Sequence, residues 1–385
     1  MNYRKFGKLD VQVSALGFGC MRLPIIDGDS GKIDQQEATR MIRYAIDQGC
    51  NYIDTAYGYH NQMSETAVGH ILQDGYRQKV NLATKLPVWL VKETADFNRL
   101  LNEQLSRLQT GHIDFYLMHA LNRDAWKKVV DLNLLGEAEK ALADGRIRHI
   151  GFSFHDDLDV FKEIVDGYHW DFCQIQYNYM DIENQAGTEG LRYAAGRGLG
   201  VVIMEPLLGG KLARDIPAIQ PLWETAAVKR TPADWALQWL WDQPEVSVIL
   251  SGMSTMQQVE ENIASAAASG AGTMPESEKA VIASVRQKLN ELSPIPCTGC
   301  EYCLPCPNGV NIPRNFAVYN EGAMYNAHDI AAGTYKNWIP DEAKAAQCIQ
   351  CQECEEKCPQ KIAISEWMPV VEEVLGMGRP YVMHL

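Results

Sequence analysis

Short apolar runs alternate with amphipathic segments along most of the chain, from about residue 14 to residue 268. Eight of these runs have the length and apolar character of buried strands. They cover residues 14–19, 51–54, 80–85, 114–119, 149–153, 171–176, 200–205 and 247–250. The stretches between them, such as residues 34–49 and 94–110, carry apolar residues at three-and-four spacing, which predicts helices. This rhythm predicts a parallel (β/α)8 TIM barrel.

A doubly wound α/β sheet has the same alternation, so the turn after the first strand helps to decide between the two folds. Its sequence, GFGCMR at residues 17–22, lacks the third glycine of the dinucleotide-binding turn G-x-G-x-x-G. The barrel is therefore favoured. Residues 3–14 predict a hairpin that turns at residues 7–10 and plugs the barrel floor.

The chain of 385 residues is longer than one hydrophobic core usually supports, so a second domain is expected. A predicted helix over residues 277–292 is broken by SPIP at residues 293–296, just before the first of many cysteines. We therefore place the boundary near residue 293. Residues 1–293 form the predicted barrel domain, and residues 294–385 form a small C-terminal domain.

Eight of the eleven cysteines fall in this C-terminal domain, in two runs. The second run has the spacing C-x2-C-x2-C-x3-C followed by proline, which is typical of bacterial two-cluster ferredoxins. The first run is one residue short before its last cysteine. In the two-cluster pattern the fourth cysteine of each run ligates the other cluster. The pattern therefore predicts two [4Fe-4S] clusters, one held by Cys297, Cys300, Cys303 and Cys358 and the other by Cys348, Cys351, Cys354 and Cys306.

Zinc is the alternative ligand for these cysteines. Structural zinc sites usually take two separated C-x2-4-C pairs, whereas each run here has three cysteines at successive x2 intervals and ends in Cys-Pro. The spacing favours iron-sulfur clusters. The residues between the two runs have a helical pattern, which indicates a mainly helical ferredoxin-type iron-sulfur domain. The isolated Cys20, Cys50 and Cys173 are expected to be small buried apolar residues.

The charge balance excludes some partners. Thirty-five basic and forty-nine acidic residues give a net charge of -14, which disfavours binding to nucleic acid or to an anionic membrane. The segment MNYRKFGKLD at residues 1–10 has no apolar core of signal-peptide length, and no apolar run in the sequence is long enough to span a membrane. We expect a cytoplasmic protein.

Four reactive side chains follow or end three consecutive predicted strands: Asp54, Tyr59, Lys85 and His119. In a barrel the carboxyl ends of the strands form the active-site rim, so these side chains are expected to meet. Singly, each has an ordinary structural explanation, such as a helix cap, a loop residue, a rim charge or a buried polar group.

The segments IDTAYGY (residues 53–59), ATK (83–85) and DFYLMH (114–119) resemble the aldo-keto reductases, and the resemblance extends over the barrel. The cysteine-rich tail is similar to that of the ferredoxin-containing branch of this family. The resemblance implies that Tyr59 is the proton donor, that Lys85 and Asp54 tune it, and that His119 orients the substrate carbonyl. The chemistry is consistent: hydride addition to a carbonyl creates an alkoxide that needs a proton, and a nearby ammonium lowers the pKa of a phenol.

The resemblance also implies contacts to a nicotinamide dinucleotide from residues at the ends of several strands. These are Gly19, Met21, Ser153, Gln174, Met204, Pro206, Leu207, Lys211, Gly252, Ser254, Gln258, Glu261 and Asn262. Met204 stands where the family often has an aromatic residue. Residues 252–262 contain no lysine or arginine for a 2'-phosphate, so the choice between NADP and NAD stays open. An ordinary capped helix beginning at Ser254 or Thr255 is the alternative for this segment.

The leading hypothesis is NAD(P)H-dependent reduction of an aldehyde or ketone to an alcohol, or the reverse oxidation, on a small-molecule carbonyl substrate. The clusters then brace the C-terminal domain or carry electrons. A second hypothesis is an electron-transfer oxidoreductase fed by a redox partner protein, either a ferredoxin or a flavoprotein. A third is a non-catalytic binding subunit, which the four reactive residues disfavour.

Overall fold

The computed structural model describes residues 1–384 and divides into two compact units. Unit 1 comprises Met1–Gly209 and Asp234–Pro275. Unit 2 comprises Gly210–Ala233 and the chain from Glu276 onward. Among residues 1–384, no helix combines the length and the apolar character needed to cross a bilayer.

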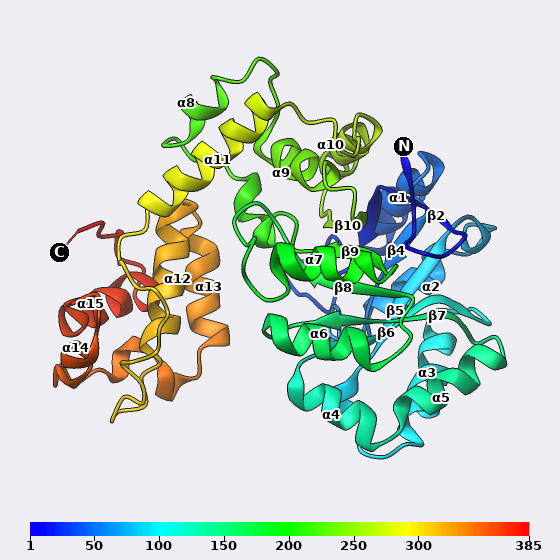
Figure 1. Cartoon of the computed structure of the whole chain (residues 1–385), viewed down its shortest axis with the longest axis horizontal. Coiled ribbons are helices and arrows are strands. Elements are labelled where there is room, and N and C mark those ends of the chain that lie inside the picture. The colour runs from blue at the N-terminus through cyan, green and yellow to red at the C-terminus, as the bar shows by residue number, and fades with distance from the viewer. Residues whose placement is uncertain (385) are drawn as a thin grey trace. The chain divides into compact units, whose positions relative to one another are not determined.

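Unit 1 contains a closed barrel of eight parallel strands, in the order β10-β3-β4-β5-β6-β7-β8-β9 (Figure 1). The strands are β3 (Leu16–Gly19), β4 (Tyr52–Asp54), β5 (Asn81–Leu86), β6 (Ile113–Leu121), β7 (Ile147–Phe154), β8 (Phe172–Gln176), β9 (Gly200–Met204) and β10 (Val246–Gly252). All eight predicted strands are present, so the TIM-barrel prediction is confirmed.

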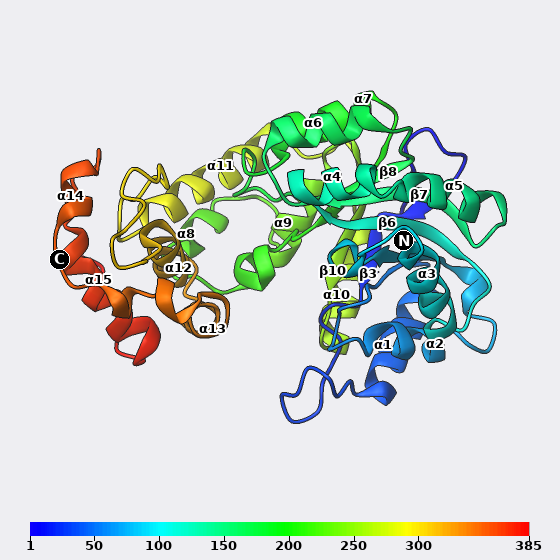
Figure 2. The same cartoon turned by 90° about the horizontal axis from the view of Figure 1, so that it is seen from below.

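Helices cover the outside of the barrel (Figure 2). They are α1 (Gln35–Asp47), α2 (Ser64–Ile71), α3 (Asp96–Arg107), α4 (Arg123–Asp131), α5 (Leu134–Ala143), α6 (Leu158–Gly167), α7 (Gly187–Gly196), α9 (Pro232–Trp241) and α10 (Met256–Ala267). In α1 the sequence explains both where the helix begins and which of its faces is buried. The Asp34 side chain accepts a hydrogen bond from the Glu37 amide at the start of α1, and Met41 and Ile42 are buried.

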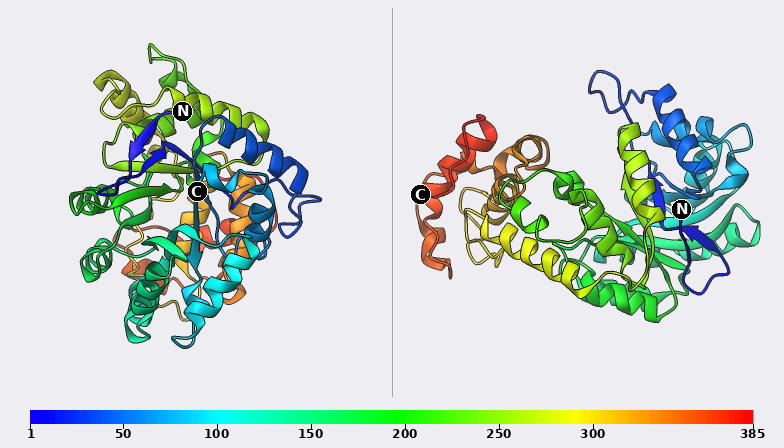
Figure 3. Two further views of the ribbon diagram at one scale, coloured as in Figure 1. Left: turned by 90° about the vertical axis from the view of Figure 1, so that its right-hand side faces the viewer. Right: turned by 90° about the horizontal axis from the view of Figure 1, so that it is seen from above.

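The amino-terminal hairpin closes the barrel at the end where the strands begin (Figure 3). Strands β1 (Tyr3–Lys5) and β2 (Gln12–Ser14) pair antiparallel, and the Phe6 ring lies 4.6 Å from the ring of Phe115. Gly7 has φ +56°, and a Cβ there would lie 2.3 Å from the Gly200 nitrogen. Only glycine allows this close approach, and the predicted floor plug is confirmed.

Unit 2 is built from short helices around a smaller apolar core. They are α8 (Gln220–Trp223), α11 (Glu276–Glu291), α12 (Ile312–Met324), α13 (His328–Trp338), α14 (Glu353–Lys357) and α15 (Ile364–Val371). Phe316, Tyr319 and Met368 are fully buried in this core. The predicted mainly helical character of the C-terminal domain is confirmed.

The chain enters unit 2 twice, which differs from the single boundary near residue 293 that the sequence suggested. After β9 the segment Gly210–Ala233 joins unit 2, and α9 leads back to unit 1. Lys211 Nζ lies 2.7 Å from Glu321 Oε2 of α12, and Arg214 pairs with Asp329 of α13. The physical reason for the difference is this set of ion pairs between residues more than a hundred positions apart, which no local pattern reveals.

Candidate active site and candidate metal centres

The four predicted catalytic side chains meet at the carboxyl ends of the strands. Lys85 Nζ lies 2.7 Å from Asp54 Oδ1, 2.9 Å from the Thr55 carbonyl oxygen and 3.4 Å from the Tyr59 hydroxyl. The ring centroids of Tyr59 and His119 are 6.2 Å apart, with the rings edge to face. Because an ammonium has three N–H donors, Lys85 uses all of them within this cluster.

Burial controls the acidity of these groups. For Lys85, burial works toward a lower pKa, but Asp54 and Tyr59 outweigh it and hold the pKa above its ordinary value. The ammonium is therefore charged at neutral pH. Burial raises the pKa of the Tyr59 hydroxyl, while Lys85 acts in the opposite direction. The sequence analysis expected Lys85 to lower the pKa of Tyr59, and it does act in that direction. In this structure, however, burial raises the pKa of Tyr59 by more than Lys85 lowers it.

Burial also holds the pKa of His119 well below its ordinary value, with Lys85 and His155 adding to the effect. The imidazole is neutral at pH 7, so it has one ring N–H to donate and one nitrogen that accepts. A register shift between Met118 and Leu121 interrupts the pairing of β6 with β7, and Ala120 there has φ +56°. Such a bulge re-aims a side chain, and here it sets the direction of His119.

The loop that carries Tyr59 is held by a histidine that the sequence analysis missed. His60 Nε2 accepts a hydrogen bond from the Leu23 amide at 3.0 Å, and His60 Nδ1 lies 2.8 Å from the Ser30 carbonyl oxygen. His60, Asn61 and Gln62 all have positive φ. This backbone is unfavourable for side-chain-bearing residues, so the His60 contacts offset its cost. A histidine beside a tyrosine carries no sequence signal for this role.

The predicted nicotinamide contacts fall into two groups. The first group lies on the same rim as the tetrad: Gly19 ends β3, Ser153 is on β7, Gln174 is on β8, and Met204 ends β9, followed by Pro206 and Leu207. Ser153 Oγ accepts from the Ala120 amide at 2.8 Å, and Gln174 Nε2 lies 3.4 Å from Met204 Sδ. Met21 follows β3 and is exposed.

The second group surrounds the start of α10. Gly252 ends β10, and the Ser254 amide donates to Gln258 Oε1 at 2.8 Å. Glu261 Oε1 accepts from Gln257 Nε2 at 2.7 Å, and Asn262 is buried and donates to Ser251 Oγ at 3.0 Å. Thr255 is the N-cap, so the capped helix of the alternative interpretation is also present.

Lys211 belongs to unit 2, where it forms an ion pair with Glu321. Its contact with the dinucleotide stays a prediction.

Orphaned polar atoms on the rim fit a polar ligand. Within residues 1–384, the buried atoms Gln174 Oε1, His119 Nδ1 and Asp54 Oδ2 have no hydrogen-bond partner. They come from strands β8, β6 and β4. Buried polar atoms without partners are rare, because each costs about 1–3 kcal/mol. A carboxamide and a carbonyl substrate supply the hydrogen-bonding groups that such atoms require.

Seven of the eight cysteines of unit 2 lie in two groups that are consistent with the crossed pattern, and the ligand assignment itself stays a prediction. Cys297, Cys300, Cys303 and Cys358 line one pocket, together with apolar residues such as Phe316 and Ile364. Cys354 lies near two further members of the second group. Burial raises the pKa of Cys354 to about 11, and the nearby thiols of Cys348 and Cys306 add to this effect.

The two cysteine runs share one backbone pattern. Positive φ occurs at Gly299 and Glu301 in the first run and at Gln350 and Gln352 in the second. In each run these are the second and fourth residues after the first cysteine, so the turns are equivalent. The Gln350 amide donates to Cys348 Sγ at 3.4 Å, a contact of the kind that tunes iron-sulfur clusters.

Four thiols around a common pocket supply the number of ligands that a [4Fe-4S] group takes. A structural zinc site also takes four ligands, so the preference for a cluster rests on the cysteine spacing in the sequence.

Comparison with known proteins decides the family. Residues 15–270 match the model of the aldo/keto reductase family. The chain belongs to the aldo/keto reductase family. Residues 296–363 of this aldo/keto reductase match the model of a 4Fe-4S dicluster domain. The protein is thus an NAD(P)-dependent oxidoreductase with a C-terminal iron-sulfur domain, as the sequence analysis expected.

Several relatives match this aldo/keto reductase along most of their own length. L-galactose dehydrogenase of Arabidopsis thaliana is 27% identical over 286 residues, which are 68% of this chain and 86% of the relative. The NADH-specific methylglyoxal reductase of Escherichia coli is 26% identical over 308 residues, which are 67% of this chain and 91% of the relative. An aldo-keto reductase from Bacillus halodurans, solved in its holo form, has a TM-score of 0.62 and 27% identity and covers 74% of this chain and 96% of its own.

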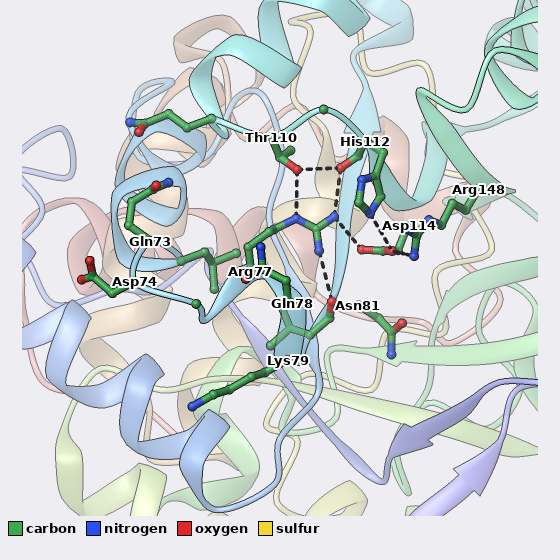
Figure 4. Close-up of a pocket in the computed structure, with 15 residues that line it drawn as sticks. Gln73, Asp74, Arg77, Gln78, Lys79, Asn81, Thr110, His112, Asp114 and Arg148 are labelled. Atoms are coloured by element: carbon green, nitrogen blue, oxygen red, sulfur yellow. Dashed lines mark hydrogen bonds and ion pairs between the residues drawn. The ribbon is translucent and has the colours of Figure 1, made fainter.

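A large cavity of about 580 Å³ lies beside the beginnings of β5, β6 and β7, whereas the tetrad lies at the carboxyl ends of the strands. Figure 4 shows the side chains that line the cavity, and its central charged groups, Arg77 and Asp114, bind one another. Arg77 donates to the carbonyl oxygens of Val80 and His112 and to Asp114 Oδ2 at 2.7 Å, and Asp114 also accepts from the Leu82 amide and from Arg148. This aldo/keto reductase uses that network to join the beginnings of β5, β6 and β7, so the cavity is a structural feature.

Proposed function

We propose that this protein reduces an aldehyde or ketone to the corresponding alcohol, with Tyr59 as the general acid. The observation that carries the proposal is the fully buried Lys85 ammonium, held 2.7 Å from Asp54 and 3.4 Å from the Tyr59 hydroxyl. A buried cation next to a phenol favours release of the phenolic proton. No other described cluster on the barrel rim combines an acid, a charged partner and a neutral imidazole.

A dihydronicotinamide held on this rim would supply the hydride for the carbonyl carbon. Tyr59 gives its proton to the carbonyl oxygen as the C–H bond forms, which completes the alcohol. The resulting phenolate is stabilised by Lys85, whose charge Asp54 maintains. His119 is neutral and donates a hydrogen bond to the same oxygen, where negative charge develops. The reverse oxidation uses Tyr59 phenolate as the base.

Gln174 and Ser153 are the residues proposed to hold the nicotinamide carboxamide. Gln174 offers a buried acceptor without a partner, and Ser153 keeps its hydroxyl proton free to donate, because its oxygen already accepts from Ala120. The relatives point to different dinucleotides: one is called NADH-specific, and a Klebsiella pneumoniae neighbour with 24% identity was solved with NADPH. We propose a nicotinamide dinucleotide, with NAD and NADP as the two candidates.

The iron-sulfur domain is proposed to hold two [4Fe-4S] clusters with crossed ligation. Cys303 and Cys358 are buried in the core of unit 2, so cluster assembly and folding of that core are linked. A bracing role follows from this burial. A second role, electron exchange with a redox partner protein, is supported by the exposed Cys300 and Cys351 and by the exposed side chains of Tyr302 and Ile349 beside them.

The experiment that tests the proposed function is the Tyr59→Phe exchange. Carbonyl reduction with NADH or NADPH, measured anaerobically on simple aldehydes, is expected to fall by about 10²–10⁴-fold, because the proton donor is lost. The dissociation constant of the dinucleotide is expected to stay within about twofold, since the ring is retained. Retained turnover in Tyr59→Phe would remove Tyr59 from this role. Turnover that requires a reduced protein carrier instead of NAD(P)H supports the electron-transfer alternative.

A further inference from the structure

A buried carboxylate that the proposed reaction does not use lies behind the tetrad. Glu65 is the second residue of α2 and is fully buried. Its Oε1 accepts hydrogen bonds from Thr84 Oγ1 at 2.7 Å and from Gln104 Nε2 at 2.6 Å, and Arg107 Nη1 lies 3.4 Å from its Oε2. A buried carboxyl group is retained only where such partners satisfy it.

The partners of Glu65 hold the backbone on both sides of Lys85. Thr84 directly precedes Lys85 on β5, and Gln104 Nε2 donates to the Lys85 carbonyl oxygen at 3.0 Å. The Tyr116 hydroxyl donates to Gln104 Oε1 at 2.8 Å, which fixes the orientation of the Gln104 amide. The base of the Lys85 side chain is therefore held from outside the barrel by a single connected network.

The same turn of α2 holds the loop that carries Tyr59. Ser64, the residue before Glu65, donates through its amide to the Tyr59 carbonyl oxygen at 3.3 Å. Its Oγ bonds the Cys20 carbonyl oxygen at 3.0 Å and lies 2.8 Å from Thr55 Oγ1. The Thr55 carbonyl oxygen in turn accepts from Lys85 Nζ. The start of α2 thus contacts the backbone of Tyr59 and, through Thr55, a residue whose carbonyl oxygen binds Lys85.

We propose that Glu65, acting through Gln104 and Thr84, is a positioning residue that fixes the contact between Lys85 Nζ and the Tyr59 hydroxyl. The proposal rests on the proposed function, because it assigns a role in the same reaction. The contact of 3.4 Å is at the long end of the hydrogen-bond range, so a displacement of a few tenths of an ångström breaks it. In a buried site, where charge interactions are strong, this loss changes the acidity of the phenol.

The test uses Gln104→Met, which keeps the side-chain length but removes both donors, and Glu65→Gln, which removes the charge. The matched control is Asp114→Asn, which weakens the other buried carboxylate network of the barrel at the end away from the tetrad. For each variant, the pH dependence of kcat is measured with the dissociation constant of NADPH and NADH. The ¹³Cζ resonance of Tyr59, assigned by its loss in Tyr59→Phe, reports the state of the phenol without turnover.

Gln104→Met is expected to lower kcat by about 10–100-fold, to move the Tyr59 titration upward by about one pH unit and to leave dinucleotide binding within about twofold. Glu65→Gln is expected to lower kcat and to raise the Tyr59 titration by smaller amounts. Asp114→Asn is expected to lower the melting temperature and to leave both kcat and the Tyr59 titration unchanged. The proposal is overturned if Gln104→Met and Glu65→Gln lose stability as Asp114→Asn does but keep the Tyr59 titration and the pH profile of the parent protein.

Two outcomes are kept apart by this design. If the parent protein reduces no carbonyl, the proposed function fails, but the Tyr59 resonance still decides whether Glu65 positions Lys85. If Glu65→Gln does not fold, Thr84→Val removes one hydrogen bond with little change in volume. An unchanged Tyr59 resonance in that variant and in Gln104→Met overturns the positioning role.

Discussion

Lys85 is the residue on which the chemistry of the rim depends most. Its ammonium is fully buried and is bonded to a carboxylate, a carbonyl and a phenol. Removing one partner of a buried ion pair leaves an uncompensated charge that costs about 3–5 kcal/mol. The charge on Lys85 is therefore maintained by its surroundings, since Asp54 and Tyr59 hold its pKa above the ordinary value, and Tyr59 faces a cation at neutral pH.

The neutral state of His119 has a consequence for the pH profile. Burial, Lys85 and His155 hold its pKa well below the ordinary value, so the imidazole gains a proton only at a pH lower than usual. The reduction rate is therefore expected to stay level as the pH falls from 8 to 6. The measurement is kcat/KM against pH, with His119→Gln as the control. A loss of rate centred near pH 6.5 in the parent protein, absent in His119→Gln, would show that the imidazole titrates normally.

The meeting of the proposed catalytic residues was predictable from the sequence, because barrel strands present their carboxyl ends on one rim. Asp54, Lys85 and His119 each lie at or near such an end, so three predicted strands were enough to bring them together. His60 and Glu65 were not predictable. Their roles depend on contacts with Ser30, Leu23, Thr84 and Gln104, and no spacing rule relates those positions.

The packing of α2 against α3 depends on one glycine. A Cβ at Gly69 would lie 2.4 Å from the Arg107 carbonyl oxygen, so the two helices approach more closely than any other residue allows. Gly69→Ala is expected to destabilise the protein by about 1–3 kcal/mol, because backbone must move. Gly196→Ala, at the exposed end of α7 with no atom within 4 Å, is expected to stabilise by about 0.5–1 kcal/mol. Thermal and denaturant unfolding measure both, and equal effects would contradict the packing argument.

The crossed cysteine arrangement makes a prediction at the scale of the two runs. Cys358 lies in the second run, but in the structure it shares a pocket with Cys297, Cys300 and Cys303. Cys358→Ser is therefore expected to alter the same cluster as Cys300→Ser, whereas Cys351→Ser alters the other one. Electron paramagnetic resonance of the reduced proteins, with iron and sulfide analysis, distinguishes the two clusters. If Cys358→Ser gives the spectrum of Cys351→Ser, the ligation is not crossed.

The helices and strands were largely predictable, because alternation and helical periodicity are local properties of the sequence. The exact first residue of a helix is less predictable, as the start of α3 shows. Thr94 and Asp96 both suit an N-cap, but the cap is Ala95, without a side-chain hydrogen bond, and the Asp96 carboxylate instead accepts from the amides of Lys92 and Glu93. The preceding turn competes for the same carboxylate, and only the folded loop decides which contact forms.

At the scale of the whole molecule, the segment Gly210–Ala233 belongs to unit 2, although it lies between β9 and the body of α9 in the sequence. It is fixed there by the Lys211–Glu321, Arg214–Asp329 and Arg230–Glu278 pairs. If the clusters stabilise unit 2, their removal is expected to increase amide hydrogen exchange in residues 210–233 together with α12 and α13. Strands β3 to β8 are expected to keep their protection. Hydrogen exchange with mass spectrometry on cluster-loaded and cluster-free protein measures this.

One outcome of that comparison would contradict the prediction. Exchange in residues 210–233 that stays unchanged, while α12 and α13 open, would show that the segment holds its structure without unit 2. Lys211→Gln with Arg214→Gln is the matched variant, since it removes the ion pairs while the clusters remain. It is expected to raise exchange in residues 210–216 alone.

The double entry of the chain into unit 2 also bears on synthesis. A ribosome releases residues 210–233 well before residues 312–338, so their ionic partners do not yet exist when the segment emerges. The early strands of the barrel can pair during synthesis. Residues 210–233, which follow β9, lack their ion-pair partners until α12 and α13 have been synthesised. If the ligation is crossed, as proposed, neither cluster can be completed before Cys358 of the second run has been synthesised.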